Sequence, residues 1–383
     1  YFGYSVSSAG DVNGDGYSDV IAGAYGNNTN TGKTYIYFGG LTMKYDADAV
    51  MTGSASLDYY GRSVSSAGDF NGDGYSDIIV GADGFSGNTG RAYLYDYYLK
   101  NEIIPDYVLY AETEYNTFGT SVSSAGDVNG DGYSDVIVGA DNYNSGTGRA
   151  YIYLGGASMD NIADVTMTGT AGYHFGESVS SAGDVNGDGY SDVIVGAPDY
   201  SSSRGRAYIY FGGAVMNNVS DVILTGEATG DEFGLPVSTA GDLNGDGYSD
   251  VVVGARLNDA TGTSSGSVYI YFGGISMNNT TDITLIGEFT ADFFGSSVST
   301  AGDVNNDGFS DIIVGSYGSD GGGSSSGKVY IYFGGSTPDS NPDVTINGTA
   351  AFDYLGYSVS GAGDVNGDGF SDVIAGAYGS DAG

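Results

Sequence analysis

The stretch SVSSAGDVNGDGYSDVIAGA, residues 5–24, returns six more times along the chain with small changes. Its first aspartate is Asp11, and the equivalent residues are Asp69, Asp127, Asp184, Asp242, Asp303 and Asp364. The intervals between them are 58, 58, 57, 58, 61 and 61 residues. A period near 60 residues, present seven times, predicts one repeat architecture over residues 1–383 and not two or three separate domains.

Each repeat contains four strand-like runs separated by clusters of Gly, Asn, Ser and Thr. In the first repeat these are residues 5–12, 19–24, 34–38 and 49–52, and no window has a sustained helical period. Four short antiparallel strands per repeat are typical of a propeller blade. The sequence therefore predicts an all-β, seven-bladed β-propeller of four-stranded antiparallel blades, with the lean Ser/Ala/Gly run nearest the axis. The alternative is a β-solenoid, whose coils are usually shorter.

Two repeats depart from this pattern. The seventh contains only the first two runs, so 26 strands are expected and the last blade is predicted to be incomplete within this chain. We expect flanking sequence or a neighbouring chain, by self-association, to cover the edge left by the run that ends at Ala377, because bare edges promote association. The chain alone is not expected to close a regular propeller. In the second repeat, the third run (residues 92–98) lacks the Phe-Gly-Gly ending.

The charge of the chain is strongly one-sided, with 48 acidic and 10 basic residues and a formal net charge of −38. This charge disfavours nucleic acid and anionic membranes as partners, and it favours bound cations in a compact fold. No apolar run reaches the ~18 residues of a membrane span, so no direct membrane insertion is expected. Cysteine is absent, which excludes disulfides and thiolate metal sites.

Between the first two runs of every repeat lies the loop D-x-N-x-D-G-x-x-D. Ca²⁺ takes six to eight oxygen ligands, which the side chains at positions 1, 3, 5 and 9 and the backbone carbonyl of position 7 can supply. Gly at position 6 permits the sharp turn, and position 4 is Gly except at Asn306, which tolerates positive φ. The predicted ligands are Asp11, Asn13, Asp15, Tyr17, Asp19, Asp69, Asn71, Asp73, Tyr75, Asp77, Asp127, Asn129, Asp131, Tyr133, Asp135, Asp184, Asn186, Asp188, Tyr190, Asp192, Asp242, Asn244, Asp246, Tyr248, Asp250, Asp303, Asn305, Asp307, Phe309, Asp311, Asp364, Asn366, Asp368, Phe370 and Asp372.

Asx-turns without a metal would also explain one such loop. Seven loops with three Asp each, however, place 21 of the 48 acidic residues at close range, where like charges repel without a cation. We therefore predict about seven Ca²⁺ per chain, which would reduce the formal charge from −38 to −24. Mg²⁺ fits less well because it requires stricter octahedral geometry. The loop is not an EF-hand, since position 12 is Ala22 in the first copy and strand-like sequence follows.

These repeats resemble the FG-GAP repeats of the integrin α-subunit propeller, and the near-identical copies are similar to bacterial FG-GAP cell-surface proteins. Phe-Gly stands at residues 2–3, 118–119, 175–176, 233–234 and 294–295, with Tyr60-Gly61 and Leu355-Gly356 in the other repeats. Gly-Ala-Pro is complete only at residues 196–198. The resemblance implies a seven-bladed propeller with calcium in the hairpins between strands one and two, opposite the ligand face. It implies an extracellular, cell-surface location and a role in adhesion. Nothing in the sequence marks an interface for an integrin β-subunit.

Three functions remain open at this point: an adhesion or ligand-binding module, a structural subunit of an extracellular fibre or surface layer, and a polysaccharide-acting enzyme or enzyme-attached domain. The catalytic inventory is thin, because there is no Cys and the single His174 lies in a turn-rich segment. Carboxylates outside the loops could still form an acid/base pair. We predict no catalytic residue and expect the chain not to be an enzyme.

The predicted topology also assigns the two faces of the ring. Loops that join strands two to three, or four to the next strand one, must emerge opposite the Asp loops, and they are long and variable at residues 25–33, 141–148, 199–204, 256–266 and 317–327. Exposed aromatic side chains can stack on sugars or anchor a protein partner, although they can also simply cover blade ends. On this face they are Tyr59, Phe85, Tyr115, Tyr143, Tyr173, Tyr200, Phe293 and Tyr317. We expect a protein or carbohydrate ligand to dock on this face.

Overall fold

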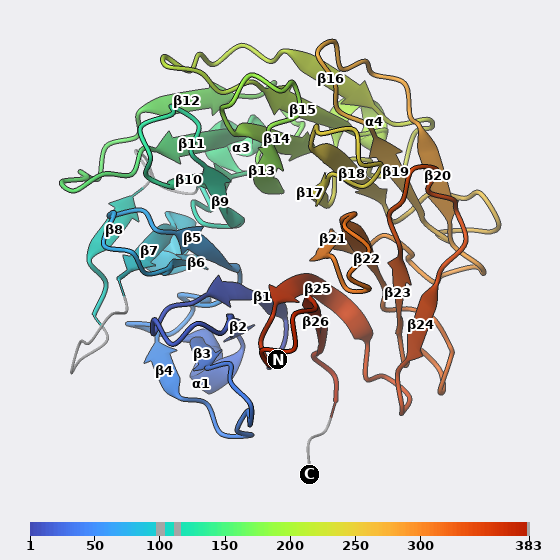
Figure 1. Cartoon of the computed structure of the whole chain (residues 1–383), viewed down its shortest axis with the longest axis horizontal. Coiled ribbons are helices and arrows are strands. Elements are labelled where there is room, and N and C mark those ends of the chain that lie inside the picture. Colours follow the sequence, from blue (N-terminus) through green and yellow to red (C-terminus); the bar gives the residue numbers. More distant parts are fainter. Residues whose placement is uncertain (97–103, 111–115, 381–383) are drawn as a thin grey trace.

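The computed structural model describes residues 1–96, 104–110 and 116–380, which form a ring of antiparallel sheets around a central opening (Figure 1). Six of the sheets have four strands in sequence order from the axis outwards, and the seventh sheet has two. The chain is therefore an all-β propeller with four-stranded antiparallel blades.

The strands of the first four blades are β1 (Ser5–Gly10), β2 (Asp19–Ala24), β3 (Lys33–Tyr37), β4 (Ala49–Thr52), β5 (Val64–Gly68), β6 (Asp77–Ala82), β7 (Arg91–Tyr95), β8 (Tyr107–Tyr110), β9 (Val122–Gly126), β10 (Asp135–Ala140), β11 (Arg149–Tyr153), β12 (Val165–Thr168), β13 (Val179–Gly183), β14 (Asp192–Ala197), β15 (Arg206–Tyr210) and β16 (Val222–Thr225). Those of the remaining sheets are β17 (Val237–Gly241), β18 (Asp250–Ala255), β19 (Ser267–Tyr271), β20 (Ile283–Ile286), β21 (Ser297–Gly302), β22 (Asp311–Ser316), β23 (Lys328–Tyr332), β24 (Val344–Asn347), β25 (Leu355–Gly363) and β26 (Asp372–Ala377).

The blades are held together by aromatic side chains that enter the wedge between neighbours. Phe118, which precedes β9, is fully buried, and its ring centroid lies 5.4 Å from that of Tyr151 on β11. The same cluster includes Ile79 and Leu94 from the preceding blade. Burying one such ring contributes about 1.5–3 kcal/mol, so each interface is a substantial apolar core.

Close backbone approach explains one recurrent glycine at these interfaces. A Cβ added to Gly81 of β6 would lie 2.1 Å from the carbonyl oxygen of Gly119 in the next repeat. The hydroxyl of Ser63 donates to the same carbonyl at 2.8 Å. Since any side chain at position 81 would collide with backbone, the second strand must end in Gly-Ala or Gly-Ser for the next blade to pack.

The ring closes within the chain through its inner part. The N–H of Ser76 donates to the carbonyl of Asp11 at 3.1 Å, and the equivalent bond recurs at every junction, including Ser18 N–H to the carbonyl of Asp364 at 3.0 Å. Strand β25 contacts both β21 and β1. The inner strands thus close into a ring through bonds between loop backbones. The chain does not complete a regular propeller by itself, as expected, because β25 and β26 form a sheet of only two strands.

The number of blades differs from the sequence prediction of seven with an incomplete last blade. Among the described residues there are six four-stranded blades, and β25 pairs with β26 alone in a two-stranded sheet. Five of the six residues of β26 are partly exposed, whereas every residue of β2 is buried. On the outer strand β24, Ile346 is 44% exposed, although the equivalent Met167 of β12 is fully buried. Outer strands beside blade 6 would cover these side chains.

Four one-turn helices lie in the loops between second and third strands: α1 (Asn27–Asn30), α2 (Phe85–Asn88), α3 (Tyr143–Gly146) and α4 (Tyr200–Ser203). The sequence did not predict these helices, because each is only four residues long and has no helical periodicity. The two central residues of each have positive φ, as at Asn144 and Ser145 of α3. These are tight turns and not helices that bury a face.

Candidate functional site

The Asp loops share one hydrogen-bond pattern, shown here for the third repeat. Asp127 accepts backbone N–H groups from Gly130 at 2.7 Å and from Gly132 at 2.9 Å, one on each carboxylate oxygen. Asn129 Oδ1 accepts the N–H of Asp131 at 2.8 Å. These bonds curl the backbone around the side chains at positions 1, 3 and 5, but among the described residues the three carboxylates of a loop do not all lie within 4.8 Å of one another.

The carboxylate at position 9 is buried and anchors the loop to its own blade. Asp135 is fully buried, and it accepts the N–H of Val128 at 2.8 Å and of Gly155 at 2.7 Å. Burial, helped by the neighbouring charges of Asp131 and Asp127, raises the pKa of Asp135 to about 7. The pKa of Asp192 and of Asp250 is likewise raised to about 7 by burial. Sequence reasoning gave this residue a ligand role and missed its backbone role.

The second repeat has the least satisfied of these carboxylates. Burial raises the pKa of Asp77 to about 8, and its Oδ1 is buried with no hydrogen-bond partner. In blade 3 the matching oxygen binds Gly155 of a Phe-Gly-Gly-type ending, which the run at 92–98 lacks. The last two residues of that run lie outside the described residues. An orphaned buried oxygen beside two further carboxylates fits a hard cation with all-oxygen ligands.

Position 4 of each loop also receives a ring from the next repeat. A Cβ on Gly72, which has φ +77°, would lie 2.3 Å from the ring of Tyr133. Gly is therefore needed here for space as well as for its backbone angle. Asn306 has φ +59°, as predicted, and Phe370, the ring that would cover it, is 41% exposed.

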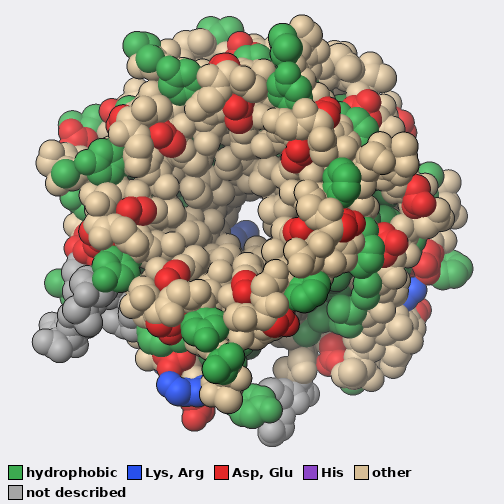
Figure 2. Space-filling model, in the orientation of Figure 1, with side chains coloured by type: hydrophobic (Ala, Val, Ile, Leu, Met, Phe, Trp, Pro, Cys, Tyr) green, Lys and Arg blue, Asp and Glu red, His purple; other side chains and the backbone are tan. Residues whose placement is uncertain are grey.

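On the opposite face, a cavity of about 330 Å³ lies at the mouth of the central channel. We call it the axial pocket. Each repeat contributes the residue that follows its Phe-Gly pair or the equivalent of that pair, and Arg256 and Tyr317 complete the lining; the seven repeat residues are Tyr4, Arg62, Thr120, Glu177, Leu235, Ser296 and Tyr357. Because the Asp loops follow the other ends of those strands, the two sites are at opposite faces. Figure 2 shows the central opening and the acidic side chains spread around the ring.

One side of the pocket mouth is an unbroken run of rings, which we call the aromatic arc. Neighbouring ring centroids are 5.0 to 6.3 Å apart, in the range of favourable stacked and edge-to-face pairs. The members in spatial order are Phe293, Tyr317, Tyr354, Tyr378, Tyr1, Tyr25 and Tyr59. The arc joins the last repeats to the first, and so it also bridges the two ends of the chain.

The other side is charged. Arg62 pairs with Asp83 at 3.1 Å, and Arg256 pairs with Glu232 at 2.8 Å. Both arginines belong to the few basic residues of the chain, and each is neutralised by its own carboxylate at this mouth. The aromatic and charged sides together give the pocket an amphipathic lining.

His174 lies between these two ion pairs. Its Nδ1 is 3.3 Å from Asp141 Oδ2 and its Nε2 is 3.8 Å from Asp199 Oδ2. Hydrogen bonding to Asp141 raises the pKa of His174, while burial and then the charge of Asp141 raise the pKa of Glu177 to about 7. Sequence reasoning treated His174 as an isolated loop residue. The signal available in the sequence is positional, since His174 precedes a Phe-Gly and Asp141 follows the adjoining second strand, but only blade packing shows that the two residues meet.

The predicted surface aromatics divide into two groups. Tyr59, Phe293 and Tyr317 belong to the aromatic arc. Phe85, Tyr143 and Tyr200 instead lie under Arg91, Arg149 and Arg206, with the guanidinium carbons 3.4, 3.8 and 3.6 Å from the ring centroids. Tyr173 packs edge-on against Tyr200 at 5.0 Å, and Tyr115 lies outside the described residues. The second group covers blade ends.

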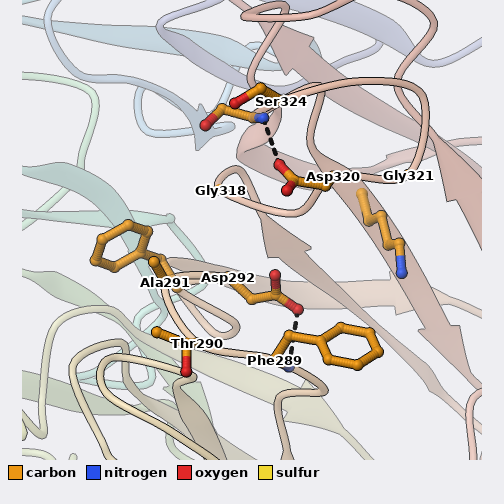
Figure 3. Close-up of a pocket in the computed structure, with 11 residues that line it drawn as sticks. Phe289, Thr290, Ala291, Asp292, Gly318, Asp320, Gly321 and Ser324 are labelled. Atoms are coloured by element: carbon orange, nitrogen blue, oxygen red, sulfur yellow. Dashed lines mark hydrogen bonds between the residues drawn. The ribbon is translucent and has the colours of Figure 1, made fainter.

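A second pocket, of about 410 Å³, opens between the loops at residues 289–293 and 318–325 (Figure 3). Asp292 accepts the N–H of Phe289 at 3.1 Å, and Asp320 accepts the N–H of Ser325 at 2.8 Å. These bonds fix the two loops that form its walls.

A comparison with protein families matches the FG-GAP repeat at residues 2–37, 60–95, 118–153, 175–210, 236–271, 294–332 and 355–383, well over half of the chain. The chain belongs to the FG-GAP repeat family. Every FG-GAP match contains one complete Asp loop, so the predicted metal-binding pattern is part of the repeat itself.

Curated relatives of this FG-GAP chain include integrin alpha subunits. Integrin alpha-5 of Xenopus laevis is 34% identical over 218 residues, which cover 53% of this chain and 20% of the relative. Integrin alpha-4 of Xenopus laevis is 34% identical over 256 residues, which cover 63% of this chain and 24% of the relative. The FG-GAP chain thus spans a quarter or less of the length of these relatives.

Among solved structures, a Dos1 propeller superimposes with a TM-score of 0.51 and 11% identity, over 94% of this chain and 73% of that one. At that identity the likeness supports the propeller fold alone. Within the described part of the FG-GAP chain, no helix has the length and apolar character needed to cross a bilayer.

Proposed function

We propose that the chain is a calcium-loaded, extracellular FG-GAP propeller that serves as an adhesion or ligand-binding module. The similarity to integrin alpha subunits supports the adhesion role and the cell-surface location. No residue is assigned a catalytic role.

Calcium binding is supported by the donor chemistry of the loops. Each loop gathers three carboxylates and one amide oxygen, and no nitrogen or sulfur ligand, which suits Ca²⁺. The raised pKa of the buried position-9 carboxylates, such as Asp135, shows that burial and neighbouring charge disfavour their ionised form. A bound cation would offset both effects, and seven such loops give about seven Ca²⁺ per chain. Positions 1, 3, 5 and 9 and the carbonyl of position 7 would hold each ion.

The observation that carries the binding role is the contrast between the two faces. The Asp loops repeat the same residues seven times, whereas the axial pocket receives seven contributions from six residue types. Loops on a constant scaffold are where binding sites diversify. We therefore assign ligand docking, of a protein or a carbohydrate, to the axial pocket and the loops around it.

A binding screen tests this assignment. The immobilised chain is exposed, in millimolar CaCl₂, to arrays of glycans and of extracellular-matrix proteins. For any probe that binds, Arg256→Gln and Tyr317→Ser should weaken binding at least about tenfold, the loss of one good contact. Tyr143→Ser with Tyr200→Ser should weaken it less, because those rings lie under arginines at the rim. Calcium content, measured by elemental analysis, should not change in either variant.

Binding that survives the axial substitutions but is abolished by Asp131→Asn would place the ligand on the Asp-loop face, with the metal bridging to it. That result would overturn the assignment of faces while leaving the calcium sites intact.

A structural role in a fibre or surface layer has its own supporting observation. A groove of about 730 Å³ runs along β26 and is lined by Ile374, Tyr378, Phe2 and Tyr37, among others. We propose that β25 and β26 are an incomplete seventh blade and that further strands cover this edge in the assembled protein.

Amide hydrogen exchange tests the source of these strands. The outward N–H groups of β26 should exchange fast in dilute solution. Their exchange should slow as the protein concentration rises if the covering strands come from a second copy. Concentration-independent exchange would rule that source out.

A further inference from the structure

The junction around His174 is chemically unlike its neighbours. At the junctions on either side, each carboxylate is paired with a guanidinium, Asp83 with Arg62 and Glu232 with Arg256. Among the described residues, no Lys or Arg forms an ion pair with Asp141 or Glu177. Asp141 also interacts electrostatically with Arg62, and Glu177 with Arg256, but both arginines form their ion pairs with other carboxylates. This partly buried junction therefore holds two carboxylates and one imidazole as its own charged groups.

The side chains of this junction are arranged as a ligand set. One carboxylate oxygen each from Asp141 and Glu177 and one ring nitrogen of His174 lie within 4.8 Å of one another, and within the described part of the chain no other three His, Cys, Asp or Glu residues meet in this way. The hydroxyl of Thr117 donates to the other oxygen of Asp141. Such a second hydrogen bond orients a ligating carboxylate toward its ion.

We propose that Asp141, His174 and Glu177 bind one divalent transition-metal ion, for which Zn²⁺ is the appropriate probe. Imidazole nitrogen favours Zn²⁺ and similar ions, while Ca²⁺ and Mg²⁺ take oxygen ligands. Three protein ligands with one position left to water or another molecule are the usual set of an accessible zinc site.

The ion would lie beside the axial pocket, because Glu177 is part of the pocket lining. The side chains of His174 and Asp141 are 33% and 17% exposed, so the site is open to ions from solvent. The chain would then hold two classes of metal at opposite faces, with all-oxygen sites in the Asp loops and one nitrogen-containing site at the axis. This inference does not depend on the proposed adhesion role.

The single histidine of the chain makes the test specific. The full chain, saturated with millimolar CaCl₂ to occupy the Asp loops, is titrated with ZnCl₂. Calorimetry should show one equivalent of additional binding, and the ¹⁵N signals of the one imidazole should shift in step with it. Co²⁺ in place of Zn²⁺ should give visible absorption of a nitrogen-ligated site.

Variants assign the ligands. His174→Gln, Asp141→Asn and Glu177→Gln should each reduce Zn²⁺ affinity at least tenfold in the presence of Ca²⁺. The matched control is Glu232→Gln, which changes the residue equivalent to His174 in the next repeat and should leave Zn²⁺ affinity unchanged. Melting temperature in CaCl₂ checks that each variant is folded.

An unshifted imidazole at excess Zn²⁺, or equal Zn²⁺ affinity in wild type and His174→Gln, would overturn the proposal. Loss of binding in Asp199→Asn together with normal binding in Glu177→Gln would overturn the ligand set, since Asp199 also approaches His174 at 3.8 Å.

Discussion

The two ends of β10 differ in how their residues are repeated around the ring. At one end, Asp135 completes an Asp loop that the other six repeats reproduce, and its carboxylate holds backbone N–H groups of its own blade. At the other end, Asp141 meets His174 and Glu177, residues that no other repeat has at those places. The loop end is constant because its backbone also bonds a neighbouring blade, as the N–H of Ser134 does to the carbonyl of Asp69 in the preceding repeat. The other end is free to vary because its contacts are between side chains.

Removing calcium should produce the largest effect, because it acts on all seven constant loops at once. A ligand present at 100 times its Kd stabilises a fold by about 2.7 kcal/mol per site. We therefore expect EGTA to lower the melting temperature strongly and Ca²⁺ to restore it better than Mg²⁺, as followed by circular dichroism. EGTA already saturated with Ca²⁺ is the control. A melting curve that EGTA leaves unchanged would mean that the loops hold themselves together without metal.

Two aspartates of one loop should separate the metal role from the backbone role. Asp192→Ala leaves the N–H groups of Val185 and Gly212 without their buried acceptor, at a cost of about 1–3 kcal/mol each, with or without Ca²⁺. Asp188→Ala removes an exposed ligand, so it should destabilise the protein in Ca²⁺ but hardly at all in EGTA. Urea unfolding in both buffers measures the two differences. Equal losses for Asp188→Ala in both buffers would contradict a metal role at position 5.

The turn at the Asp-loop end of each second strand was predicted well from the sequence, because the same loop motif occurs seven times. The spacing of Asp, Asn and Gly predicted the turn, and the four runs were found with ends shifted by one or two residues, as where β1 ends at Gly10 and not at Val12. Strand β1 is shorter than predicted because its pairing with β2 shifts register between Ser8 and Gly10, so the Asp loop begins directly after Gly10. A register shift is a property of strand pairing and leaves no signature in composition.

The variable end could not be predicted in the same way, because its members are distant in sequence. Asp141 and His174 lie 33 residues apart and belong to different repeats, so they meet only through blade packing. Tyr1 and Tyr378 come together in the aromatic arc for the same reason, since closure brings the first and last repeats side by side. The bond from the N–H of Ser18 to the carbonyl of Asp364, which joins the first and last loops, could not be predicted because counting strands says nothing of bonds between loop backbones.

An ion pair on the variable face should contribute much less than the buried carboxylate of Asp192. The side chains of Arg256 and Glu232 are 34% and 22% exposed, so solvent screens their attraction. We expect Arg256→Gln to cost about 0.2–1 kcal/mol in urea unfolding, with unchanged calcium content. A loss above about 3 kcal/mol would mean that the pair supports the fold and that the two faces do not divide stability from binding. Lys44→Gln, which removes the exposed pair with Asp48, is a matched control on the outer edge.

The smallest effect on the free energy of unfolding is expected at Asn306, the one Asp-loop position 4 that is not Gly. Asn306→Gly restores the residue of the other six loops at a position with φ +59°. Gly removes the cost of a positive φ in the folded state, which stabilises the variant, but Gly also has more conformational freedom in the unfolded chain, which destabilises it. Each of these two opposing contributions to the free energy of unfolding is about 0.4–2 kcal/mol.

If they cancel, the remaining contribution comes from Phe370, which is 41% exposed and which would gain room to pack on position 306 as Tyr133 packs on Gly72. We therefore expect a gain of no more than about 1 kcal/mol in urea unfolding. Asn306→Ala should lose about 1–2 kcal/mol, because Ala keeps the Cβ and lacks the local hydrogen bonding that lets Asn adopt this conformation. If both variants lost stability equally, neither the space above position 4 nor the backbone angle would favour Gly here, and the Asn306 side chain itself would stabilise this loop.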